Sequence, residues 1–261
     1  MKCKEVIAHL EQLSPLEYAC DWDNVGLLVG HEQQEIHSIM VALDPTLKTV
    51  EEAVLQKVDM LITHHPLIFK SVNRISEQDA CGRKLLQLTE NHIAYYAMHT
   101  NFDIMGSMSR IVADRFDLSD LQPLEETAIY NEEPVGIGYI GNLEQEISLE
   151  ECAKLVKKQF HIEGMRVYGE KQCRIRKVAV SPGSGKSMIN LAKQKGAEVL
   201  ITGDIGHHEG IDAVEMGLSV IDATHYGLEH VFAEFIKEYL EKLCSDVTVH
   251  IYDSKSPYWT I

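Results

Sequence analysis

Five side chains with metal-binding chemistry lie in three short clusters of the sequence. They are His64 and His65 in THHP, Asp103 in HTNFD, and His225 with Glu229 in THYGLE. The set contains imidazoles and carboxylates and no thiolate, which suits Zn²⁺, Mn²⁺, Fe²⁺, Co²⁺ or Ni²⁺ without choosing among them. Five such donors are enough to hold two divalent ions. The sequence therefore predicts two divalent metal ions per chain, in a dinuclear centre.

The charge of such a centre indicates its chemistry. Two divalent ions bring four positive charges, and the carboxylates of Asp103 and Glu229 return two negative ones. The remaining positive charge lowers the pKa of a bridging water and attracts an anionic or carbonyl-bearing substrate. The result is a metal-bound hydroxide that can act as a nucleophile. We therefore predict a metal-dependent hydrolase.

Each cluster taken alone also has an ordinary explanation. The His64–His65 pair is compatible with two solvated histidines in a turn. His225 and Glu229 are four residues apart, as in a surface charge pair on a helix, and Asp103 is compatible with a helix N-cap. The positions of the clusters favour a metal site over these ordinary explanations, because all three clusters follow predicted strands. The carboxyl ends of parallel strands are where α/β proteins bind ligands.

The histidine pair also predicts how the ions are shared. Pro66 biases His65 toward an extended backbone, in which adjacent side chains diverge. The pair therefore suits two different ions, or one ion and a supporting residue, better than one shared ion.

The elements that would position these clusters alternate between strand and helix. Apolar runs predict strands over 39–43, 60–63 and 93–98, with helices over 46–57 and 83–90. The second half repeats this order from IRKVAV to AEVLITGD and shares the triplet LIT, although any two β-α-β segments look alike. We predict an α/β fold of two intertwined, internally duplicated lobes with mostly parallel mixed sheets.

The region 119–150 separates the two halves and is rich in acidic and turn residues. It contains a predicted strand over 135–140, and a helix is predicted over 149–160. We therefore place an N-terminal lobe at residues 1–125 and a C-terminal lobe at 126–261, with the metal site between them.

A second motif, PGSGKS at 182–187, ends like a phosphate-binding loop. That loop needs a glycine five residues before Gly185, and the position holds Val180. We interpret the segment as a tight turn between a strand and a helix, although its free N–H groups could bind an anion. A nucleotidase of the P-loop type would depend on Lys186.

The composition excludes some classes of binding partner and indicates the cellular compartment. The formal charge is −16, with 24 basic against 40 acidic residues and no long basic run, which argues against a nucleic-acid or anionic-membrane surface. The six cysteines are scattered and predict reduced thiols in a cytoplasmic protein. No apolar stretch approaches the roughly 18 residues that a membrane span requires.

Five stretches of the chain resemble one known family in sequence order. They are DWDNVGLLVG at 21–30, THHP, HTNFD, TGDxxxH at 202–208 and DATHYGLE at 222–229. They are similar to the YbgI family, known as GTP cyclohydrolase I type-two homologues or NGG-interacting-factor-like proteins. The resemblance spans nearly the whole chain, which matches the short form without an inserted domain.

The resemblance implies a duplicated α/β fold, a toroidal homohexamer and a dinuclear centre that faces an internal cavity. Carried over by position, His65 and Asp103 would hold one ion and His64 and His225 the other. Glu229 would bridge the two ions.

One stretch departs from the family. Where members often have GDIKYH, this chain has GDIGHH at 203–208, so it lacks the lysine and tyrosine side chains for any substrate contact that they make. His208 keeps its place and is the first candidate for proton transfer, followed by His99. Either histidine could equally orient a metal ligand.

The family name adds a small nucleotide or heterocycle as the expected substrate. Two alternatives stay open: a metal-binding scaffold or interaction protein without turnover, and a phosphoesterase that uses the same centre.

Overall fold

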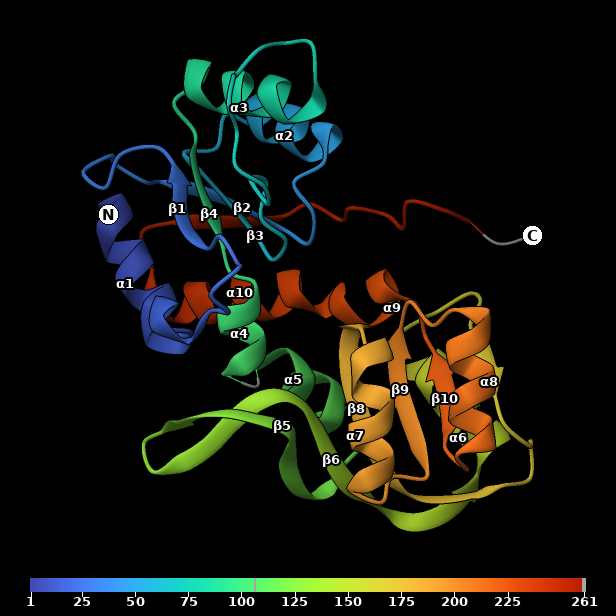
Figure 1. Cartoon of the computed structure of the whole chain (residues 1–261). Helices are drawn as coiled ribbons and strands as arrows, with labels where there is room; N and C mark the ends of the chain where they lie inside the picture. Colours follow the sequence, from blue (N-terminus) through green and yellow to red (C-terminus); the bar gives the residue numbers. More distant parts are fainter. Residues whose placement is uncertain (106, 260–261) are drawn as a thin grey trace. The chain divides into compact units, whose positions relative to one another are not determined.

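A computed structural model describes residues 1–105 and 107–259 in two compact units. The first unit comprises Met1–Phe102 and His230–Lys255, and the second comprises Asp103–Glu229 and the chain from Ser256 (Figure 1). The first unit is discontinuous because the last long helix packs on its sheet and the last strand belongs to that sheet. These bounds differ from those of the predicted lobes, 1–125 and 126–261.

The first unit is built on a five-stranded sheet in the order β1-β4-β3-β2-β11. Strands β11, β2, β3 and β4 run parallel, and β1 is antiparallel at the edge. The strands are β1 (Gly26–Val29), β2 (Ser38–Ala42), β3 (Met60–Thr63), β4 (Ala94–Ala97) and β11 (Thr248–Ile251). All residues of β3 and β4 are buried, as parallel strands covered on both faces require.

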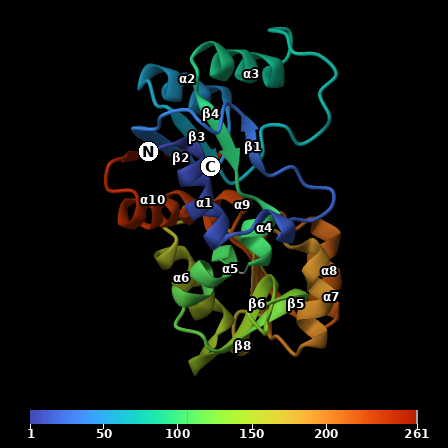
Figure 2. The same ribbon diagram turned by 90° about the vertical axis from the view of Figure 1, so that its left-hand side faces the viewer.

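Helices cover both faces of this sheet (Figures 1 and 2). Helices α2 (Leu47–Leu55) and α3 (Ala80–Glu90) pack on one face around Leu61 and Tyr95. Helix α10 (Val231–Leu243) lies on the other face, with α1 (Cys3–Leu13) beside it. A single 3₁₀ turn, η1 (Leu16–Tyr18), follows α1.

Register brings the functional loops of the first unit to one edge. Thr63 at the end of β3 pairs with Ala42 in β2 and with Ala97 in β4. The residues that follow these strands therefore emerge together, at the carboxyl edge of the sheet.

The second unit holds a six-stranded mixed sheet in the order β5-β6-β8-β9-β10-β7. Strands β8, β9 and β10 are parallel, and the others are antiparallel to their neighbours. The strands are β5 (Ser119–Tyr130), β6 (Glu133–Ser148), β7 (Arg166–Tyr168), β8 (Arg174–Ser184), β9 (Val199–Gly203) and β10 (Ser219–Asp222). Thr202 in β9 pairs with Ser181 and Asp222, so these strands also end together.

Two layers of helices flank this second sheet (Figure 2). Helices α5 and α6 lie on one face, and α7 and α8 pack on the other around Leu200 and Val220. The helical segments of the second unit are α5 (Ser107–Asp114), α6 (Leu149–Gln159), η2 (Lys186–Met188), α7 (Ile189–Gln194), α8 (His207–Glu215) and α9 (His225–Glu229). The short α4 (Thr100–Ile104) carries Asp103.

The predicted fold class is confirmed as mixed α/β with two sheets. The order strand, helix, parallel strand occurs as β2-α2-β3 and again as β8-α7-β9. The shared LIT triplets fall at 61–63 in β3 and at 200–202 in β9.

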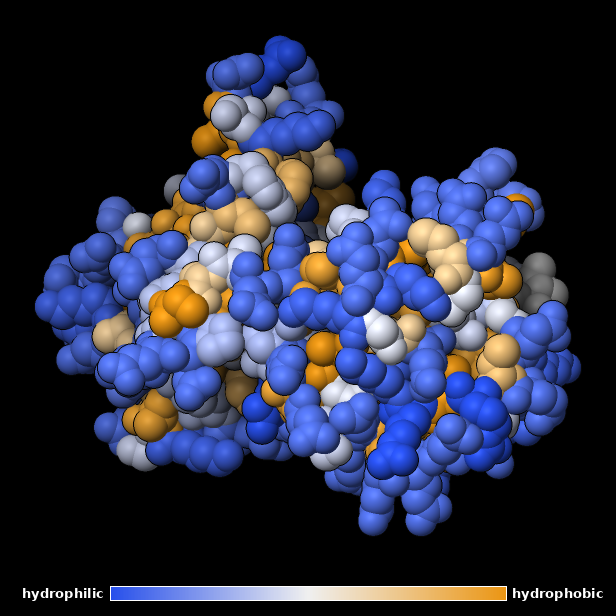
Figure 3. Space-filling model, turned by 60° about the horizontal axis from the view of Figure 1, so that its bottom comes forward, coloured by the Kyte–Doolittle hydropathy of each residue, from blue (hydrophilic) through white to orange (hydrophobic). Residues whose placement is uncertain are grey.

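The surface agrees with the charged composition. Hydrophilic residues predominate on the face drawn in Figure 3, and hydrophobic residues form small groups among them. Among the described residues, none of the helices combines the length and apolar character that crossing a bilayer requires.

Candidate metal centre

Three histidines of the first unit come together at the carboxyl edge of its sheet. His64 and His65 follow β3, and His99 follows β4; one ring nitrogen of each lies within 4.8 Å of the other two. The ring centroids are 4.9 Å apart for His64 and His65, and 5.2 and 5.6 Å from these to His99. We call this set the first-unit cluster.

The backbone explains the close approach of His64 and His65. Strand β3 ends at Thr63, and the chain bends at both histidines instead of continuing extended. The bend brings together two rings that an extended backbone would direct apart. His64 is fully buried, whereas the side chain of His65 is 21% exposed.

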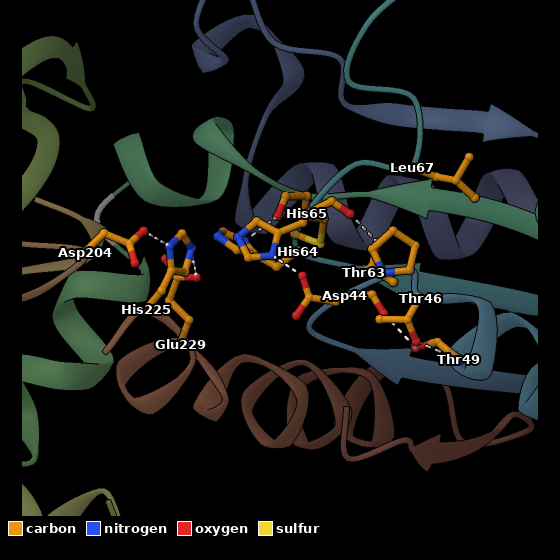
Figure 4. Close-up of polar contacts among 12 residues, drawn as sticks. Asp44, Thr46, Thr49, Thr63, His64, His65, Leu67, Asp204, His225 and Glu229 are labelled. Atoms are coloured by element: carbon orange, nitrogen blue, oxygen red, sulfur yellow. Dashed lines mark hydrogen bonds and ion pairs between the residues drawn. The ribbon is translucent and has the colours of Figure 1, made fainter. Parts of the chain in front are cut away.

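Hydrogen bonds at Nδ1 orient these rings. His64 Nδ1 donates to the carbonyl of Met98 at 2.7 Å, and His65 Nδ1 donates to Asp44 Oδ1 at 2.7 Å (Figure 4). Because a neutral imidazole carries one proton, a proton on Nδ1 leaves the lone pair on Nε2. An oxygen acceptor on the second ring nitrogen is the usual arrangement of a metal-binding histidine.

His99 is oriented by a buried carboxylate. Its Nδ1 lies 2.9 Å from Asp23 Oδ1, and Asp23 Oδ2 also accepts from the Thr100 amide and hydroxyl, at 2.9 and 2.5 Å. Burial opposes ionisation of Asp23. The hydrogen bonds from His99 and Thr100 and the attraction to His99 outweigh it and hold the pKa of Asp23 well below its ordinary value.

Tyr95 in β4 ties down the loop that carries His65. Its buried hydroxyl lies 2.6 Å from Thr63 Oγ1 and 3.0 Å from the His65 carbonyl, and it accepts from the Leu67 amide at 2.8 Å. Burial raises the pKa of Tyr95, so the hydroxyl stays protonated. The loop is therefore bound to the neighbouring strand by one neutral group.

His225 and Glu229 form the centre of the second-unit cluster, on one face of α9. His225 Nε2 lies 2.9 Å from Glu229 Oε2, and His225 Nδ1 lies 2.8 Å from Asp204 Oδ2 (Figure 4). Glu229 is buried, and Asp204 follows β9. Donor atoms this close fit one coordination sphere, and Asp204 holds the imidazole in place.

Asp222 at the end of β10 organises the two loops of this second-unit cluster. Its buried carboxylate accepts from the amides of Ile205 and Thr224, each at 3.1 Å, and from Arg166 Nη2 at 2.5 Å. Asp204 and Thr224 have φ of 58° and 66°, a conformation that is costly for residues with a side chain. The Asp222 carboxylate therefore fixes loops in the second unit as the Tyr95 hydroxyl does in the first, but it is a charged group.

Glycines make room for the ligand pair. Gly183 has φ of +74°, and a Cβ there would lie 2.5 Å from Glu229 Oε1 and 3.6 Å from His225 Nε2. A Cβ on Gly203 would lie 2.5 Å from the His225 amide nitrogen. The segment PGSGKS, which lacks the P-loop pattern, thus packs against the His225–Glu229 pair.

Two other predicted residues lie elsewhere. His208 is exposed in the first turn of α8, with its ring 5.3 Å from that of His207, and it belongs to neither cluster. Asp103 lies half-buried in α4. Sequence reasoning missed the residues that orient the clusters, namely Asp23, Asp44, Tyr95, Gly183 and Asp222.

The donor set fits a divalent transition-metal ion. All four clustered imidazoles, His64, His65, His99 and His225, direct Nδ1 at an oxygen acceptor. Three of these acceptors are carboxylates, which raise the basicity of the imidazole that they hold.

The chain matches a family model and many known proteins. The model for Duf34/NIF3 (NGG1p interacting factor 3) matches residues 1–257. A GTP cyclohydrolase 1 type 2 homolog of Methanocaldococcus jannaschii is 35% identical over 255 residues, which is 96% of this chain and 98% of that protein. One of the same name from Clostridium acetobutylicum is 34% identical over 232 residues, covering 88% and 85%.

Solved structures agree over the whole chain. A Bacillus cereus protein related to NIF3 superposes with a TM-score of 0.91 at 25% identity, covering 100% of this chain and 99% of that one. Reduced HcgD from Methanocaldococcus jannaschii gives 0.84 at 34% identity, covering 96% and 97%. The protein ybgI gives 0.84 at 20% identity, which shows the fold alone.

Proposed function

Because the chain belongs to the Duf34/NIF3 family, we propose that it is a dinuclear-metal-dependent hydrolase of a small nucleotide or heterocycle. The observation that carries the metal part is the orientation of the histidines. In both units, ligand-type imidazoles are fixed at Nδ1 by carboxylates or a carbonyl. The substrate class rests on relatives named GTP cyclohydrolase 1 type 2 homolog.

We propose that the ligands are drawn from both units. His64 and His65 come from the first, and Asp103, His225 and Glu229 from the second. His65 and Asp103 would hold one ion, His64 and His225 the other, and Glu229 would touch both. When bound, two divalent ions would lower the pKa of a water and stabilise negative charge on the substrate.

The remaining residues of the two clusters would position ligands and move protons. Asp44 and Asp204 hold the rings of His65 and His225. His99 is oriented by Asp23, so its Nε2 can accept a proton beside the ligand histidines. We retain His208 as the second candidate for proton transfer. The family resemblance also supports a toroidal homohexamer in the cytoplasm.

Elemental analysis of the purified protein tests the ligand set. We expect close to two divalent ions per chain, and a marked loss in Glu229→Ala because that carboxylate is proposed to touch both ions. Glu238→Ala, an exposed glutamate in α10, is the matched control and should keep both ions. Retention of both ions in Glu229→Ala would rule out the bridging role.

Turnover on a panel of nucleotides and phosphoesters separates the candidate functions. Hydrolysis that is lost in His65→Ala but kept in His37→Ala, an exposed histidine, would support the enzyme. Turnover of phosphoesters but not of heterocycles would favour a phosphoesterase. The family description as an interacting factor supports the other candidate, a metal-binding scaffold, for which the metal-loaded protein would show no turnover.

A further inference from the structure

We propose that Trp22 and Phe69 form a stacking platform for the planar ring of the substrate. The two side chains lie in loops of the first unit, and we call them the aromatic platform. This inference rests on the proposed function, because it assigns the ring-binding element of the same site. It commits to a ligand class, an aromatic heterocycle that carries an anionic group.

The platform is exposed, and its rings surround His99. Trp22 is 60% exposed and Phe69 is 52% exposed, which is unusual for large aromatic side chains in a folded unit. Their ring centroids are 5.8 Å apart, and they lie 6.0 and 6.3 Å from the His99 ring. These distances are typical of aromatic contacts and leave ring surface open to solvent.

Hydrogen bonds hold the two loops in place. Asp23, next to Trp22, is fixed by His99 and Thr100. The side-chain amide of Asn24 donates to the carbonyl of Ile68, next to Phe69, at 2.7 Å. The rings are therefore pre-organised before any ligand binds, which lowers the entropic cost of stacking.

The platform adjoins the proposed metal ligands. His99 contacts the exposed rings on one side and lies 5.2 Å from His64 and 5.6 Å from His65 on the other. A heterocycle stacked on Trp22 and Phe69 would thus lie beside the histidines that hold the ions and beside the proposed proton carrier. Because it adjoins these histidines, the platform is better placed to bind a substrate than an exposed apolar patch elsewhere on the surface.

The charge on the Phe69 side of the platform favours an anionic ligand, whereas Trp22 lies between Asp21 and Asp23, and the Asp23 carboxylate is bonded to His99. The segment after Phe69 contains Lys70 and Arg74 and has no acidic residue before Glu77, in a chain with a net charge of −16. Both cations are exposed. A phosphate carried by the heterocycle would be attracted to this segment.

The same rings could instead contact a second copy of the chain. A stable interface between proteins buries on the order of 1,000 Å² or more, far beyond two side chains. Two rings beside a histidine cluster match the size of one heterocycle better. A contact between copies would change the oligomeric mass of the Trp22 and Phe69 variants without changing their affinity for GTP, and this outcome overturns the proposal.

Tryptophan fluorescence gives a direct readout, because the chain has only two tryptophans. In Trp259→Phe protein, Trp22 is the sole tryptophan, and Trp259 lies far along the chain with 79% exposure. We expect GTP to quench its emission saturably, whereas ribose 5-phosphate, which lacks the ring, should leave it unchanged. No quenching by GTP at concentrations that calorimetry shows to be saturating would overturn the proposal.

Substitutions test the energetic role. Phe69→Ala and Trp22→Ala should each weaken GTP binding about tenfold by calorimetry, the size of one lost base–aromatic stack. Tyr258→Ala, an exposed aromatic of similar accessibility, should bind as the parent does. If Trp22→Ala fails to fold by circular dichroism, Trp22→Leu replaces it. Unchanged affinity in these variants, with or without a change in oligomeric mass, overturns the proposal.

The test separates this inference from the proposed function. In Glu229→Ala protein, the quenching amplitude at saturating GTP should persist, because the platform belongs to the first unit. In the metal-loaded parent protein, quenching without turnover would contradict the hydrolase and leave the platform intact. Turnover without quenching would do the reverse.

Discussion

The two units fix the loop after the LIT strand with chemically different side chains. In each, a loop after an LIT strand is tied to the neighbouring parallel strand by one buried polar side chain. The first unit uses the neutral hydroxyl of Tyr95, and the second uses the carboxylate of Asp222, supported by Arg166. The neutral group fixes the loop of His65 at low electrostatic cost, whereas the charged one must keep all its donors in place.

The clusters differ in the same sense. The first-unit cluster contains three imidazoles, while the second-unit cluster combines an imidazole with the carboxylates of Glu229 and Asp204. Both units place a carboxylate on Nδ1 of a histidine, Asp44 on His65 and Asp204 on His225. Only the second unit adds a carboxylate, Glu229, on the Nε2 side of its histidine. Substitutions in the second unit should consequently have the larger effects.

Asp222→Ala should be the most damaging change. It leaves the buried amide of Ile205 and the part-buried amide of Thr224 without their acceptor, at a cost of about 3 kcal/mol in the free energy of unfolding. It also releases the loops of Asp204 and His225, so metal binding should weaken. Urea unfolding and metal titration measure the two effects. A loss no larger than that in Tyr95→Phe would contradict the comparison between the two groups.

Gly183→Ala should weaken metal binding through Glu229. The new Cβ would lie 2.5 Å from Glu229 Oε1 and displace the carboxylate, and the left-handed backbone adds strain of about 1–2 kcal/mol. Gly196→Ala is the matched control, because φ is +80° there but the nearest atom, Lys177 Nζ, lies 3.7 Å away. Both variants should lose similar stability, and only Gly183→Ala should lose metal, by at least tenfold in titrations. Equal metal affinity in the two variants would show that the glycine is needed for the turn alone.

Tyr95→Phe should have an intermediate effect in the first unit. The Leu67 amide loses its acceptor, which costs about 1–2 kcal/mol of unfolding free energy. The His65 ring keeps its bond to Asp44, so metal affinity should change little. Urea unfolding and metal titration again give the measurements. A metal loss as large as that in Gly183→Ala would mean that the two units depend on their loops to the same degree.

The parallel strands could be predicted because they are continuous apolar runs. The predicted strand 60–63 has the observed bounds of β3, and the predicted strand 93–98 contains β4. Of the long hairpin of β5 and β6, the sequence predicts only the part of β6 at 135–140 as a strand, and it predicts the region 119–150 as a boundary between lobes. Its turn places Asn131 and Glu132 at φ of 49° and 68°. Glutamate is rare in such a turn, so the usual Asn-Gly signal was absent.

The candidate site was predictable only in part, because local sequence patterns reveal its ligands but not the residues that orient them. Histidines and carboxylates that follow apolar runs can be recognised by type and spacing. The residues that orient them come from distant segments: Asp23 lies 76 positions before His99, and Asp204 lies 21 before His225. Such pairings depend on strand order, which local spacing does not encode.

Two buried thiols, Cys3 in the first unit and Cys152 in the second, give the smallest expected effect, a dependence of stability on pH. Burial, with the charge of Glu32, raises the pKa of Cys3 to about 11, and burial raises that of Cys152 to about 12. In the unfolded chain both thiols ionise near pH 8.5. A raised folded pKa contributes stability that is complete below this value and is lost as the pH rises toward the folded pKa.

The free energy of unfolding should therefore fall between pH 8 and pH 10 in the parent protein. Cys152→Ala and Cys3→Ala should each show a smaller fall, and the exposed Cys173→Ala is the control that should fall as the parent does. Because the folded pKa of Cys152 is higher, its contribution should continue to decline at a pH where that of Cys3 has already been lost. Urea unfolding at several pH values measures these slopes. If the free energy of unfolding falls as steeply in Cys152→Ala as in the parent, then burial in the second unit does not raise the pKa of the Cys152 thiol.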